Sequence, residues 1–167
     1  MDLNDDNAID MIIVGNMYGA EGDIIRYDAG KGLVLFGNGD GKFIPVSPVV
    51  SGFVSQYDTR GLVSVKRSGS KEEPTVTFIT AVNQGKATTY TLGKNIAEHL
   101  KVVPVDPSVA SSFMVKLGDK VRKVEPYCGS SYRSQTSCNL VLPKNAVVLT
   151  GKQNSKTGAQ KQRKSKS

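Results

Sequence analysis

The chain has 167 residues, enough for one domain or two small ones with a buried core. An apolar content of 38%, 17 glycines, 7 prolines and no tryptophan favour many short strands joined by turns over a helical bundle. No apolar run is long enough to span a membrane, and the N-terminus lacks the basic and then apolar layout of a signal peptide.

The net charge of +7 is concentrated at the C-terminus. Residues 151–167 hold six Lys or Arg and no acid, and the remainder has 16 basic and 15 acidic residues, a net charge of +1. The segment 151–167 has almost no apolar side chain, so burial cannot offset the entropy cost of ordering it. A disordered basic tail is therefore predicted, which either solubilises the chain or contacts polyanions non-specifically.

Apolar runs and alternating stretches predict a series of short strands. In chain order they cover 11–14, 32–36, 42–46, 62–66, 75–82, 86–92, 112–117, 120–125, 139–142 and 146–150. Three turns join neighbouring strands, at 37–41, 83–85 and 118–119. A loop begins at Arg67, the only weak helical pattern covers 95–100, and Pro104 and Pro107 mark a junction. The prediction is an all-β chain with a boundary near 95–108.

The opening stretch, from Asp2 to Asp10, has the pattern D-x-N-x-D-x-x-x-D. Calcium takes about six to eight oxygen ligands, and alternate residues of a tight loop can supply several of them. The predicted ligands are the side chains of Asp2, Asn4, Asp6 and Asp10 and the carbonyl of Ala8. The pattern does not continue as an EF-hand, because Ile13 stands where a bidentate Glu is required and a strand follows.

The loop and the strand after it resemble the calcium loop of FG-GAP (VCBS) propeller repeats. In that family a phrase like F-G-N-G-D-G-x-F follows, and this chain has it from Phe36 to Phe43. The resemblance implies that residues 1–95 are a fragment of a β-propeller, with partial blades, because a propeller needs at least about four blades of four strands. It also implies that the chain is part of a longer protein.

The stretch VEPYCGSSYRSQ, from Val124 to Gln135, is similar to the G-S-x-Y-x-S-Q signature of the ASPIC/UnbV module. Pro126 and Cys128 depart from the aromatic residues expected there. The resemblance implies a small β-sandwich or barrel-like module over 96–150, which follows the propeller part. The alternative is a turn with a packed Tyr and hydroxyl-to-backbone hydrogen bonds.

Together these resemblances imply a non-enzymatic, calcium-associated interaction or adhesion module, located outside a bacterial cell or in its envelope. Its ligand would be an unknown protein or a glycan, and open strand edges would favour self-association. Calcium binding is expected to be weak, because chain termini fray. The alternative function is binding of a polyanion, nucleic acid or glycan, through residues 151–167.

Other candidate residues have ordinary explanations as well as functional ones. His99 is the only histidine, and no motif around it suggests a hydrolase triad or a zinc site. Arg26 lies between Asp23 and Asp28, which favours a surface ion-pair cluster over an acid/base pair. Tyr18, Tyr27 and Tyr57 could form a ligand platform, but tyrosine is also common in strands. Cys128 and Cys138 could form a disulfide, and the alternative is two small apolar residues that pack without meeting.

Overall fold

The fold comes from a computed structural model that describes residues 1–67, 75–106, 110–126 and 138–153. These residues are mostly strand with two short helices, which confirms the predicted all-β class. Over the same residues no closed barrel or propeller is detected. Neither helix in this part of the chain is long and apolar enough to cross a membrane.

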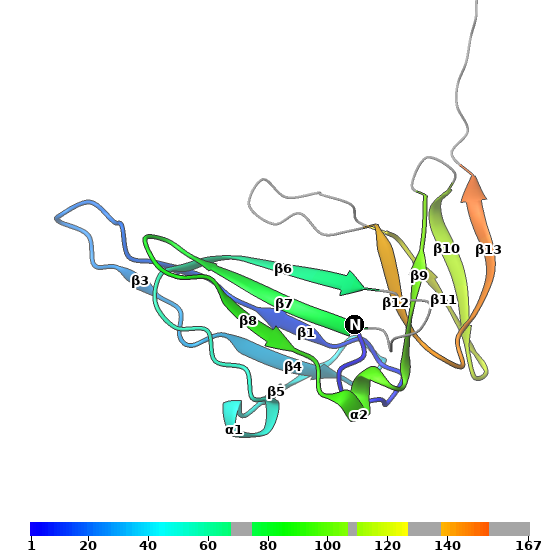
Figure 1. The fold of residues 1–167 in the computed structure, drawn as a ribbon. Helices are drawn as coiled ribbons and strands as arrows, with labels where there is room; N and C mark the ends of the chain where they lie inside the picture. The colour runs from blue at the N-terminus through cyan, green and yellow to red at the C-terminus, as the bar shows by residue number, and fades with distance from the viewer. Residues whose placement is uncertain (68–74, 107–109, 127–137, 154–167) are drawn as a thin grey trace, which may run out of the picture.

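The strands before residue 92 form three antiparallel sheets, which we call the N-terminal unit (Figure 1). One sheet has the order β1-β4-β5, a second has the order β6-β7-β8, and β2 pairs with β3. The elements are β1 (Met11–Ile13), β2 (Asn16–Met17), β3 (Tyr27–Asp28), β4 (Leu33–Gly37), β5 (Phe43–Val46), α1 (Pro48–Ser51), β6 (Thr59–Arg67), β7 (Thr75–Val82) and β8 (Thr88–Thr91).

The two larger sheets face one another across an apolar hollow of about 630 Å³. Val34 of β4 and Phe78 of β7 line it from opposite sheets, and both are buried. The ring of Phe53 lies 4.7 Å from that of Tyr90 and closes one wall. Polar and apolar residues alternate along β7, which explains why its sheet turns one face inward, whereas β4 is apolar from Leu33 to Phe36.

The later strands form a smaller group at one end of the molecule, which we call the C-terminal unit (Figure 1). After α2 (Lys94–Ala97), β9 pairs with β12, and a second sheet has the order β11-β10-β13. The strands are β9 (Leu100–Pro104), β10 (Ala110–Leu117), β11 (Lys120–Val124), β12 (Asn139–Pro143) and β13 (Val147–Gln153). The core holds Val115, Leu117, Leu140, Leu142 and Ala146.

The predicted strands and turns are confirmed, with small shifts at their ends, in the described ranges. The sequence prediction missed β2, β3 and α1, which are very short, and β9, because Pro104 and Pro107 suggested a junction. Pro104 fits because β9 belongs to a two-stranded sheet and is an edge strand, where a missing N–H is tolerated. The predicted helix over 95–100 is one turn long, and Leu100 begins β9.

The predicted disordered tail, residues 151–167, includes three residues that belong to a strand. Strand β13 continues to Gln153, which pairs with Ala110, so residues 151–153 belong to a sheet. Backbone hydrogen bonds to a neighbouring strand do not require apolar side chains, which is why the composition of this segment was misleading. Residues 154–167 lie outside the described residues.

Three further predictions fall wholly or partly on residues that the structure does not describe. The loop after Arg67 falls on residues 68–74 and most of the ASPIC/UnbV-like stretch, Val124 to Gln135, falls on residues 127–137, and both ranges lie outside the described residues. Cys138 is disulfide-bonded, and Cys128, the only other cysteine in the sequence, falls within 127–137.

Candidate functional site

The N-terminal loop curls around the carboxylate of Asp2. Asp2 is only 3% exposed, and its two carboxylate oxygens accept four backbone N–H groups. The donors are Asn4 at 3.3 Å, Asp5 at 2.7 Å, Asp6 at 3.3 Å and Asn7 at 2.8 Å. Such a tight curl requires left-handed backbone, and Asn7, in the position where calcium loops usually have Gly, has a φ of 66°.

The side chains of Asn4 and Asp6, both residues of this loop, are hydrogen-bonded to one another. Asn4 donates from Nδ2 to Oδ2 of Asp6 at 2.9 Å, and Oδ1 of Asp6 accepts the N–H of Ala8 at 2.7 Å. The other amide atom, Oδ1 of Asn4, is buried and has no hydrogen-bond partner. A buried oxygen without a donor is costly, and a cation is one partner that would satisfy it.

Asp10 joins the loop to the end of β4. Its carboxylate accepts the N–H of Leu3 at 2.6 Å and the N–H of Gly37 at 2.9 Å. Burial raises the pKa of Asp10, the two N–H donors lower it, and the charges of Asp6 and Asp2 raise it again. The net result is a pKa above the ordinary value for Asp, because burial has the largest effect.

Gly37 allows the loop to approach β4 closely. A Cβ on Gly37 would lie 2.2 Å from the carbonyl oxygen of Ile9, so no other residue fits without movement of the backbone. The turn that follows is held by Asn38, whose Oδ1 accepts the N–H of Asp40 at 2.9 Å and of Lys42 at 3.2 Å. The two stretches that carry the resemblance to FG-GAP repeats, Asp2 to Asp10 and Phe36 to Phe43, are thus in direct contact.

Basic side chains of the C-terminal unit lie beside the loop. A hollow of about 380 Å³ has Asp6 and Asn7 of the loop on one side and Lys120 and Arg122 of the β10–β11 hairpin on the other. Burial holds the pKa of Arg122 below its ordinary value, although attraction to Asp2 favours the charged form. His99, for which no role was predicted, places Nδ1 3.3 Å from the carboxylate of Asp5.

The structure thus brings Asp2, Asn4 and Asp6 into one loop and ties Asp10 to it through Leu3. Ala8 is buried, and its N–H is already used by Asp6. Among the described side chains there is no group of three or more His, Cys, Asp or Glu placed to hold a metal ion. Within the described ranges, Oδ1 of Asn4 is a buried side-chain oxygen that has no hydrogen-bond partner.

A second polar cluster lies at the start of β6, around the buried carboxylate of Asp58. Arg60 donates to it from Nε at 2.8 Å and from Nη2 at 2.6 Å, and Asn83 donates from Nδ2 at 2.9 Å. The hydrogen bonds from Arg60 are the main reason why the pKa of Asp58 is lowered to about 2. Sequence reasoning missed this cluster, because Asp58 and Asn83 are far apart in the chain. Of the predicted surface cluster of Asp23, Arg26 and Asp28, the structure shows the pair of Arg26 and Asp28 at 3.8 Å.

The pKa of Asp58 predicts how stability depends on pH. An unfolded Asp titrates near about 4, so between pH 4 and 2 the unfolded chain binds a proton that the folded chain does not. The stability that Asp58 contributes is therefore complete above about pH 4 and is lost as the pH falls through about 2. Urea unfolding of the wild type and Asp58→Asn should show a stability difference that shrinks over this range. A difference that stays constant from pH 6 to 2 would contradict the assignment.

Comparison of the chain with protein-family models, with curated proteins and with solved structures finds no match.

Proposed function

We propose that this chain is a non-enzymatic, calcium-associated interaction module that acts outside a bacterial cell or in its envelope. The observation that carries the proposal is the buried, unpartnered Oδ1 of Asn4 inside a loop that also holds Asp2 and Asp6. A hard cation that accepts carboxylate and amide oxygens suits such a loop. Calcium would be held by Asp2, Asn4, Asp6, Asp10 and the carbonyl of Ala8.

The proposed relation to FG-GAP repeats is supported by the contact between the two phrases. Asp10 closes the loop and Gly37 begins the glycine-rich turn, and they are hydrogen-bonded at 2.9 Å. In this proposal the N-terminal unit corresponds to partial propeller blades and the C-terminal unit to an ASPIC/UnbV-like β module. Calcium would then fix the loop against the end of β4, so that neighbouring surfaces are presented in one geometry.

Calcium binding is proposed to be weak, with a dissociation constant of about 10⁻⁴ to 10⁻³ M. The fraying of a free terminus is not the main reason, because Asp10 donates its N–H to the carbonyl of Met1 at 2.8 Å. The stronger reason is Arg122, whose positive charge lies close enough to interact with Asp2 and would oppose a cation. Many oxygens of the loop also already accept N–H groups.

Calorimetric titration of the full chain with calcium chloride tests the proposal. We expect Asp6→Asn to weaken binding by about tenfold or more, because it removes a ligand charge. Asp40→Asn removes the same charge from an exposed residue of the neighbouring turn and should leave the affinity unchanged. Arg122→Gln should bind calcium more tightly than the wild type. Equal heats for the wild type and Asp6→Asn would rule out this loop as a calcium site.

A further inference from the structure

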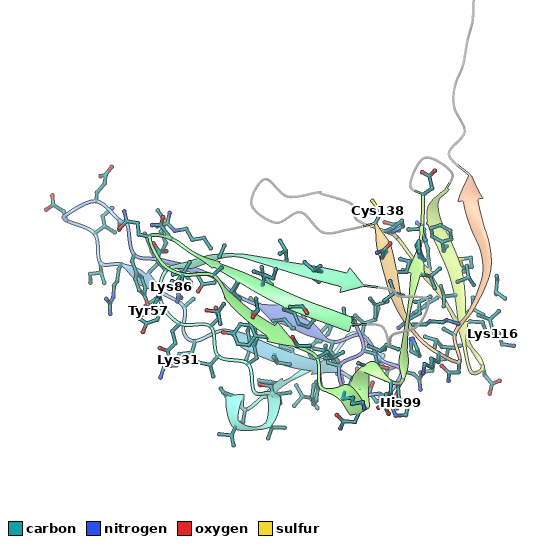
Figure 2. All side chains as sticks on the ribbon, viewed as in Figure 1. Lys31, Tyr57, Lys86, His99, Lys116 and Cys138 are labelled. Atoms are coloured by element: carbon teal, nitrogen blue, oxygen red, sulfur yellow. The ribbon has the colours of Figure 1, made fainter. Side chains whose placement is uncertain are left out.

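A groove of about 770 Å³ lies in the N-terminal unit, between the segment 54–58, Tyr18 and the hairpin that joins β7 to β8. Tyr57 and Lys86 line this groove, and Figure 2 shows both at the end of the molecule that is farther from the C-terminal unit. Figure 1 marks the N-terminus, and with it the calcium loop, on the side of the C-terminal unit. The groove is therefore a separate site.

Tyr57 is held in a conformation that tyrosine rarely adopts. Its φ is 66° and its side chain is 67% exposed, so no burial of the ring compensates for the strained backbone. Its carbonyl oxygen accepts Nδ2 of Asn16 at 2.6 Å and the N–H of Thr59 at 2.8 Å. Asn16 is buried and also binds Gly30 and Ala29, so a rigid support presents the ring to solvent.

The opposite wall of the groove is fixed by Asp58. The backbone N–H of Asn83 donates to the carbonyl of Asp58 at 2.8 Å, and its side chain donates to the carboxylate at 2.9 Å. These bonds anchor the hairpin turn, in which Gln84 also has a positive φ, 56°. Since Arg60 neutralises Asp58, the wall presents amides to a ligand and little net negative charge.

The side chains that are exposed along the groove are polar, apart from the ring of Tyr57. They are Gln56, Asn83, Gln84, Lys86 and Thr88. One exposed ring surrounded by amide and hydroxyl groups matches a sugar, which has C–H groups on one face and hydroxyls around its edge. An apolar ligand would instead leave these amides without partners.

We propose that this groove is a carbohydrate-binding site. A sugar ring stacks on Tyr57, and its hydroxyls exchange hydrogen bonds with the amides of Gln56 and Gln84. The proposal rests on the proposed interaction function and adds the class of its ligand. It does not depend on calcium binding, because none of the groove residues belongs to the N-terminal loop. Tyr27, which the sequence grouped with Tyr18 and Tyr57, does not line the groove.

The test is calorimetric titration of the full chain with cello-, chito-, manno-, xylo- and maltohexaose, each with calcium and with EGTA. We expect at least one of these sugars to bind, and Tyr57→Gly to weaken its binding by about tenfold or more. Glycine adopts a φ of 66° without strain, so this variant removes the ring and keeps the backbone. Tyr27→Ala is the control, because Tyr27 is 61% exposed and lies outside the groove.

Binding by none of the five hexaoses would overturn the proposal, as would equal binding by the wild type and Tyr57→Gly. Sugar binding that persists in EGTA while the calcium titration fails would reject the calcium function alone. A heparin hexasaccharide is titrated in parallel. Heparin binding that survives Tyr57→Gly and disappears when residues 154–167 are deleted belongs to the basic tail and counts against the groove as its site.

Discussion

Gly37→Ala is expected to lower the free energy of unfolding by about 2–3 kcal/mol. The added methyl group would lie 2.2 Å from the carbonyl oxygen of Ile9, and backbone cannot move aside as the end of a flexible side chain can. Relief requires the loop to separate from β4, which also breaks the hydrogen bond from Gly37 to Asp10. Urea unfolding followed by circular dichroism measures the loss, and calcium titration should show weaker binding in the same variant.

Gly15→Ala is the matched control for this prediction. A Cβ at Gly15 meets no atom within 4 Å, so its effect should stay within about 0.5 kcal/mol. If Gly37→Ala were as stable as Gly15→Ala, the loop would not pack against β4. The contact between Asp10 and Gly37, which supports the proposed function, would then not exist.

The sequence predicted the local structure around this contact but not the contact itself. The continuous apolar run of β4 and the Asn and Gly residues of the following turn act over short distances, so a pattern of a few residues predicts them. The bond from Gly37 to Asp10 spans 27 residues, and no periodicity encodes such a pairing. One hint was available: a glycine at a strand end often marks a close approach of another backbone segment.

The groove shows the same division between local and long-range information. Strand β7 was predicted with both ends correct, and the turn at 83–85 was predicted from its Asn and Gly. The left-handed backbone of Tyr57 depends on a hydrogen bond from Asn16, 41 residues away, and no local rule places a tyrosine there. Likewise, Arg122 reaches the N-terminal loop only because the C-terminal unit packs beside it.

Leu142→Ala is expected to destabilise the C-terminal unit by about 2–5 kcal/mol. Leu142 is 2% exposed and packs with Val115, Leu117 and Leu140, so truncation leaves a cavity between the two sheets of this unit. Leu149→Ala makes the same chemical change at a residue of β13 that is 48% exposed, and should cost much less. Urea unfolding of both variants, without reductant so that the disulfide of Cys138 is kept, measures the difference.

The same variant also tests whether the chain divides near residue 95. Every strand pair in the described ranges joins strands of one unit, β1 to β8 or β9 to β13. The units also meet beside the N-terminal loop, where Lys120 of the C-terminal unit and Gly39 of the N-terminal unit line the same hollow. We therefore expect Leu142→Ala to speed hydrogen exchange of β10 and β12 amides and to leave β7 amides protected. Equal loss of protection in β7 would mean that the two units unfold as one cooperative domain, and the boundary would be wrong.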